Sequence, residues 1–156
     1  MTTPNHEQFI EMALEEARKG EAEGNAPFGS VLVRDGQVVA SAHNQVTSGH
    51  DPTSHAETQV VRKAGVSLGT ENLSECTLYT TSEPCPMCMG AIIVSRVSTL
   101  VMGGRISADR RPYGVYSVET FLDLTNSISR LNVVTGVLQE RCETMRDDWF
   151  RQHAQR

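Results

Sequence analysis

The stretch CTLYTTSEPCPMCMGAIIVS, residues 76–95, anchors the prediction of the fold. It opens with CTLYTT, which predicts a strand, and closes with MCMGAIIVS, which predicts a helix. Between the two, Pro86 occupies a position that is favoured in the first turn of a helix. Cys85 and Cys88 are therefore predicted to lie where a strand ends and a helix begins.

On the N-terminal side of this stretch, the sequence predicts a helix followed by a hairpin. Asn5 begins a pattern that resembles a capping box, and apolar residues then recur at helical spacing as far as Gly20. Residues 28–44, FGSVLVRDGQVVASAHN, predict two short apolar strands. The strands are joined around Asp35 and Gly36, a pair that is typical of tight hairpin turns.

The remaining segments continue the alternation of helices and strands. A helix is predicted from near His55 to Gly65 or just beyond. Two further strands are predicted at 98–104 and 131–136, with the helix-like segment 116–125 between them. A last helix is predicted from an apolar stripe at helical spacing: Leu138, Cys142, Met145 and Trp149.

This order of elements predicts an α/β fold in a single domain over residues 1–156. The connection between the strands at 98–104 and 131–136 is longer than a hairpin needs, and it suits a parallel crossover that contains a helix. We therefore expect a three-layer α/β/α sandwich with a mixed five-stranded sheet.

Composition bounds the class of protein. The chain has 156 residues, of which 38% are hydrophobic and 21% charged, as in ordinary globular proteins. No apolar run approaches the roughly 20 residues that span a bilayer, and the N-terminus has no secretory pattern. We therefore expect a cytoplasmic protein without membrane partners. The net charge of −5 argues mildly against a broad nucleic-acid surface.

A second motif helps to decide what the two cysteines of the stretch do. Alone, their spacing fits a disulfide, a redox pair, two buried thiols or a metal site. The motif SHAET, residues 54–58, adds His55 at another predicted helix start. His55, Cys85 and Cys88 would give a Zn²⁺ ion three protein ligands and leave the fourth position open for water, as in catalytic zinc sites. We expect one Zn²⁺ per chain.

Glu57 lies two residues after His55, roughly 200° around a helix, so it cannot easily bind the same ion. In the first turn it can instead stand beside the water and carry a proton. The alternative interpretation is that His55 is structural and that Glu57 only complements the helix dipole. The combined pattern H-x-E…P-C-x-x-C, however, is the signature of the zinc-dependent nucleobase deaminases.

With these motifs, most of the chain resembles the cytidine deaminase superfamily. The resemblance lies in APFGSVLVRDGQVVASAHNQVTSGHDPTSHAE and LYTTSEPCPMCMGAI, and it is strongest to the branch of bacterial guanine, tRNA adenosine and yeast-type cytosine deaminases. It implies the cytidine deaminase-like fold and a homodimer. It further implies that His55, Cys85 and Cys88 bind zinc, that Glu57 moves protons and that Asn44 hydrogen-bonds the substrate base.

The base itself stays open. PFG and HDPTSHAE resemble guanine deaminases, but RRPYGVY, residues 110–116, has no carboxylate to grip guanine. DDWF, residues 147–150, resembles cytosine deaminases, and the resemblance implies that Trp149 or Phe150 covers the base. The alternative for Trp149 is a core anchor of the last helix. Acidic residues that follow the aromatic pair in that group are replaced here by Arg151 and Gln152.

We therefore expect a hydrolase that deaminates a free nucleobase or a related aminoheterocycle, guanine-like or cytosine-like, and releases ammonia. The partner would be this small molecule, with nucleic acid unlikely. A tRNA adenosine deaminase is the first alternative, and a catalytically inactive, zinc-stabilised domain is the second. Arg105, Arg110 and Arg111 would meet an anion or phosphate, or would belong to a solvated loop.

Overall fold

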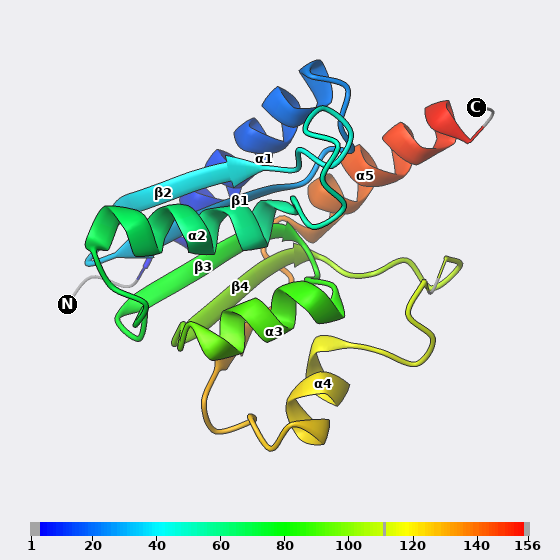
Figure 1. Cartoon of the computed structure of the whole chain (residues 1–156). Helices are drawn as coiled ribbons and strands as arrows, with labels where there is room; N and C mark the ends of the chain where they lie inside the picture. Colours follow the sequence, from blue (N-terminus) through cyan, green and yellow to red (C-terminus); the bar gives the residue numbers. More distant parts are fainter. Residues whose placement is uncertain (1–3, 111, 155–156) are drawn as a thin grey trace.

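A computed structural model describes residues 4–110 and 112–154. Within them, the strands form one mixed sheet in the order β2-β1-β3-β4-β5, with helices on both faces (Figure 1). The predicted three-layer α/β/α sandwich with a five-stranded sheet is confirmed. The elements, in chain order, are α1 (His6–Ala22), β1 (Gly29–Arg34), β2 (Gln37–His43), α2 (Ala56–Leu68), β3 (Cys76–Ser82), α3 (Pro86–Val94), β4 (Thr99–Gly104), α4 (Val118–Leu124), β5 (Asn132–Val134) and α5 (Gln139–His153).

Local sequence explains the antiparallel part of the sheet. The side chain of Asn5 accepts a hydrogen bond from the backbone N–H of Gln8 and so caps α1. β1 and β2 pair as an antiparallel hairpin. At its turn Asp35 and Gly36 have φ of 51° and 72°, the two left-handed conformations that a type I′ turn requires.

The second half of the sheet is parallel, and for the pair of β4 and β5 the long connection predicts this. β3 pairs with β4 in parallel through α3, and β4 pairs with β5 in parallel through α4. The carboxyl ends of β3 and β4 consequently lie side by side at one edge of the sheet. The segments that follow these ends form the candidate site.

Alternating side chains build one core on each face of the sheet. Leu32, Leu78 and Leu100 belong to the cluster that packs against α2, α3 and α4. Their neighbours Val31 and Tyr79 belong to the cluster with α1 and α5. Successive strand residues point to opposite faces of the sheet, so neighbouring residues enter different cores. Both faces are buried because helices cover them, with α1 and α5 on the side opposite α2 and α3 (Figure 1).

Residues with positive φ set two of the helix boundaries. α2 continues to Leu68 and ends at Gly69, whose φ of 65° gives the left-handed cap that stops the helix. α5 begins at Gln139 rather than Leu138, because Leu138 has a φ of 51° and lies outside the helix. None of the described helices combines the length and the apolar character that crossing a membrane requires.

The predicted apolar stripe faces the core, since Cys142 is buried and Leu138 and Met145 pack against the same cluster. The rotation of α5 also buries the polar Arg146, and Trp149 is half-buried. A close approach to β4 sets this rotation, since a Cβ on Gly103 would lie 2.4 Å from the Sγ atom of Cys142. With Cys142 held against the strand, Arg146 and Phe150 follow it at intervals of one helical turn.

Candidate active site

The site lies where three chain segments meet at the N-termini of α2 and α3. His55 is the N-cap residue of α2, and Cys85 is the N-cap residue of α3. Neither side chain makes a capping hydrogen bond, so both are available to face a ligand. Pro86 occupies the first helical position of α3, as predicted, and Cys88 follows one turn into the helix.

His55, Cys85 and Cys88 form a triangle of ligand atoms. The Sγ atom of Cys85 lies 3.5 Å from Nδ1 of His55 and 3.5 Å from Sγ of Cys88, and the third edge, from Cys88 to His55, is 3.6 Å. Tetrahedral zinc with its usual bond lengths separates neighbouring sulfur and nitrogen ligands by roughly 3.5–3.8 Å. The donor set and its spacing therefore fit a zinc ion with a fourth position left for another ligand.

The electrostatics of the triangle favour a thiolate. Hydrogen bonds from the Cys88 thiol and from His55 hold the pKa of Cys85 well below its usual range. The same contact with Cys85, together with burial, raises the pKa of Cys88, and the hydrogen bond to Cys85 raises the pKa of His55. Negative charge thus gathers on Cys85 at the N-terminus of α3, where the helix dipole stabilises it.

Glu57 lies beside the triangle and is fixed in place. Its residue is 5% exposed, and its Oε1 atom accepts a hydrogen bond of 2.9 Å from the Thr80 hydroxyl. Its Oε2 atom lies 3.5 Å from the Sγ atom of Cys88. Burial raises the pKa of the Glu57 carboxyl, a direction that suits a group which both takes and returns a proton.

A cavity of about 360 Å³ opens onto these groups. It has the size of a small ligand site, and its lining combines apolar and aromatic side chains with polar and charged ones. The lining residues are Phe28, Asn44, His55, Ala56, Glu57, Ser82, Glu83, Cys85, Ile106, Ser107, Arg110, Pro112, Tyr113, Arg146 and Phe150.

Asn44 is buried in the cavity wall in a fixed orientation. Its Oδ1 atom accepts a hydrogen bond of 3.0 Å from the Val46 N–H, and its amide nitrogen donates to the Ala26 carbonyl over 3.3 Å. The amide carries a second N–H that can bind a ligand. This placement is compatible with base binding by Asn44, which stays a prediction.

The two aromatic residues at the chain end separate in space. Phe150 lines the cavity, 6.4 Å from the ring of Phe28, and the Arg110 guanidinium lies 3.9 Å from the Phe150 ring centre. Trp149 stacks on His153 at 4.1 Å and lines a groove towards α1 instead. Of the two residues, Phe150 is the one that borders the cavity, and its role in covering a base stays a prediction.

The three arginines have different surroundings. Arg105 is bound in ion pairs to Glu83 and Glu119, so it is not a free anion site. Arg110 is exposed at the cavity. Arg111 lies outside the described residues. Sequence reasoning missed Arg146, whose only signal is its position one helical turn before Phe150.

Comparisons with known proteins identify the family. Residues 3–104 match the model of the cytidine and deoxycytidylate deaminase zinc-binding region. The chain therefore belongs to this deaminase family, and the recognised superfamily branch is confirmed by relatives named as tRNA adenosine and guanine deaminases.

Three relatives illustrate the similarity. A tRNA-specific adenosine deaminase from Bacillus subtilis is 38% identical over 94% of this chain and 89% of its own length. A guanine deaminase from the same organism is 48% identical, but over 59% of this chain and 60% of its own length. A solved structure from a study of tRNA:A34 deaminases is 34% identical with a TM-score of 0.76, and the match covers 88% of this chain and 98% of that one.

Proposed function

We propose that the protein is a zinc-dependent hydrolytic deaminase of an aminated nucleobase. The observation that carries this proposal is the triangle of His55, Cys85 and Cys88, with the buried carboxylate of Glu57 beside it at the cavity. When bound, zinc supplies Lewis-acid activation of water near neutral pH. In the net reaction, water forms a C–O bond at the ring carbon, the C–N bond to the amine breaks and ammonia leaves.

Glu57 carries the proton in this scheme. Its Oε1 atom is held by Thr80, so its other oxygen is directed towards the triangle. It removes a proton from water, transfers it to the ring and later protonates the departing amine. Asn44 orients the base, and the apolar cavity wall excludes bulk water.

Adenosine in tRNA is the leading substrate. Two relatives named as tRNA-specific adenosine deaminases are 38% and 37% identical over more than nine tenths of the chain. One guanine deaminase relative matches little more than half of the chain, and a solved guanine deaminase structure covers 96% of it at only 28% identity. This favours the alternative of the sequence analysis over the free base, and it weighs against the expectation that nucleic acid is not a partner. The exposed Arg110 at the cavity supports this candidate, because a guanidinium can bind a phosphate.

A free base is the second candidate, because Phe150 and Phe28 flank the cavity. An aromatic pair of this kind suits a small planar molecule that is stacked and shielded from water. The net charge of −5 also limits attraction to a polynucleotide.

The test is ammonia release from zinc-loaded protein at increasing salt, with a tRNA anticodon stem-loop and with free guanine, cytosine, isocytosine and adenine. Binding through phosphates weakens steeply with salt, whereas binding of a neutral base does not. Activity on the RNA that falls with salt supports the first candidate. Salt-independent activity on a free base, with none on RNA, supports the second.

A further inference from the structure

The connection between β4 and α4, residues 105–117, forms a large part of the cavity wall. We call it the substrate wall. Its cavity-lining residues are Ile106, Ser107, Arg110, Pro112 and Tyr113. Within its described part, the substrate wall contains no helix or strand. Something other than regular secondary structure must therefore hold it at a defined distance from the metal ligands.

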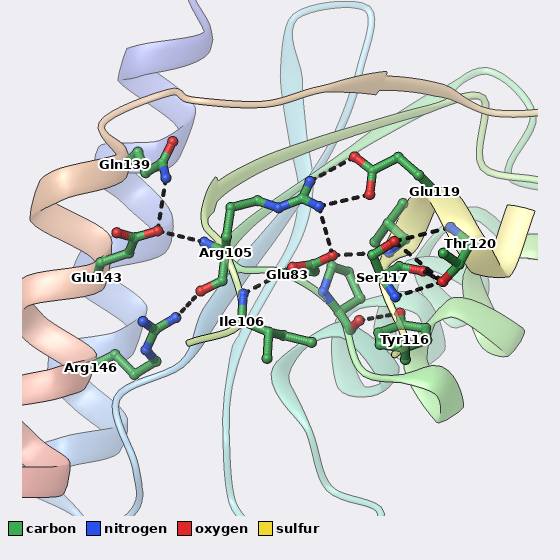
Figure 2. A network of polar contacts seen from close by, with 12 residues as sticks. Glu83, Arg105, Ile106, Tyr116, Ser117, Glu119, Thr120, Gln139, Glu143 and Arg146 are labelled. Carbon is green, nitrogen blue, oxygen red and sulfur yellow. Dashed lines mark hydrogen bonds and ion pairs between the residues drawn. The ribbon is translucent and has the colours of Figure 1, made fainter. Parts of the chain in front are cut away.

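One carboxylate binds both ends of this wall. The Oε2 atom of Glu83 accepts a hydrogen bond of 2.9 Å from the Ile106 N–H, at the start of the wall. Its Oε1 atom accepts one of 2.9 Å from the Val118 N–H, immediately after the wall. The Glu83 side chain is 3% exposed, and Figure 2 shows it at the centre of the surrounding polar contacts.

The charge of Glu83 is compensated from the same wall. Arg105 lies 3.2 Å from Oε1 of Glu83 and also forms two hydrogen bonds, of 2.8 and 2.7 Å, with the carboxylate of Glu119. A buried carboxylate is stable only when it is paired and its oxygens accept hydrogen bonds, and both conditions are met here. Each oxygen of Glu83 accepts a hydrogen bond from a backbone N–H at one end of the wall, so its contacts support a role in holding the wall.

Further contacts join the wall to its surroundings. Glu83 lies two residues before Cys85, and the Tyr116 hydroxyl donates to the Pro84 carbonyl between them. On the other side, the Arg105 N–H donates to Glu143 over 2.9 Å, and Arg146 donates to the Arg105 carbonyl (Figure 2). The wall is thus attached to the metal-ligand segment and to α5.

We propose that Glu83 is a positioning residue that sets the substrate wall relative to Cys85 and thereby determines how tightly the substrate is bound. This rests on the proposed function for its kinetic consequence only. Glu83→Gln keeps the shape of the side chain but places an NH₂ group against one backbone N–H. One end of the wall should then be released while the triangle remains intact.

The first measurement is amide hydrogen exchange at Ile106 and Val118 in the zinc-loaded protein, which does not depend on any substrate. Glu83→Gln should accelerate exchange at one or both amides by about tenfold or more. The matched control is Glu119→Gln, which removes the exposed partner of Arg105 but leaves both backbone bonds of Glu83. It should leave exchange at both amides unchanged.

The second measurement is steady-state kinetics with the substrate found above. Glu83→Gln should raise KM about tenfold with kcat within threefold and zinc content unchanged, and Glu83→Asp, the variant to use if Glu83→Gln does not fold, should fall between it and the native protein. Unchanged exchange, loss of zinc or a fall in kcat alone would each overturn the proposal. Absence of any deamination by native protein, with exchange accelerated in Glu83→Gln, would overturn the proposed function and leave the positioning role standing.

Discussion

The two sides of the cavity are built in different ways. On the metal side, His55, Glu57, Cys85 and Cys88 come from the first turns of two helices and are fixed by regular secondary structure. On the opposite side, the substrate wall is irregular, and side-chain contacts attach it to its neighbours. From this difference we predict that reactivity and substrate choice depend on separable parts of the chain.

The largest effect is expected on the metal side. Cys88→Ala removes one of the three proposed ligands, so the protein should lose its zinc and with it all measurable deamination. Elemental analysis of purified protein measures the zinc content. Cys142→Ala, which changes a buried thiol on α5 away from the triangle, is the control and should keep about one zinc per chain. A metal-free variant that remained fully active would contradict the proposed role of zinc.

The next effect distinguishes the aromatic neighbours at the chain end. Phe150→Ala should raise KM roughly tenfold while the melting temperature changes little, because its ring lines the cavity. Trp149→Ala should lower the free energy of unfolding by about 1–3 kcal/mol with kcat/KM nearly unchanged, because its half-buried ring packs outside the cavity. Kinetics and thermal melting of both variants test this. The reverse assignment would show that α5 is rotated differently.

A smaller effect is expected from Gly103→Ala, which tests whether the substrate side of the cavity can change while the metal side keeps its zinc. In Gly103→Ala, the new methyl group would collide with Cys142, so α5 must move and carry Arg146 and Phe150 with it. We expect a loss of about 1–3 kcal/mol in unfolding free energy and a raised KM, with zinc retained.

The double variant Gly103→Ala/Cys142→Ala lacks the Sγ atom with which the new methyl group collides. It should recover part of the unfolding free energy and part of the native KM. Gly90→Ala is the control, since a Cβ there meets no atom within 4 Å. Loss of zinc in Gly103→Ala would show that the two sides are not separable.

The metal side could be predicted from sequence because its residues lie at fixed spacing around helix starts. A strand, a proline and a cysteine suffice to place Cys85 and Cys88, and the connection from β2 through α2 to β3 brings His55 to them. The substrate wall could not be predicted in this way. The partners of Glu83 are backbone N–H groups of an irregular segment, and no periodicity indicates where such groups will lie.

The sequence alone could not choose between the two interpretations of Trp149, a ring that covers the base and a packing residue of the last helix. Apolar spacing gives the face of an isolated helix, but the rotation of α5 is set by the contact of Cys142 with Gly103 on another element. Packing therefore turned the polar Arg146 inwards and left Trp149 half-buried. The rotation of α5 about its axis is therefore known only from the tertiary structure.

The smallest effect concerns pH. The Arg105 guanidinium holds the pKa of Glu119 at about 2, below its ordinary value of 4.5. The ionised carboxylate therefore stabilises the fold above about pH 4.5, and this contribution is lost as the pH falls towards 2. Glu119→Gln should melt slightly earlier than native protein at pH 6, and the difference should shrink as the pH falls from 4.5. A difference that grew on acidification would have the wrong sign.

The central claim is that Glu57 carries the proton of a hydrolytic deamination at the zinc site. Its most direct test is ammonia release by zinc-loaded native protein and by Glu57→Gln, with zinc content measured on the same samples. Glu57→Gln should keep its zinc and its melting temperature while turnover falls by at least about 10²–10⁴-fold, because the base and acid steps fail together. Turnover within tenfold of the native rate, with zinc present, would contradict the claim.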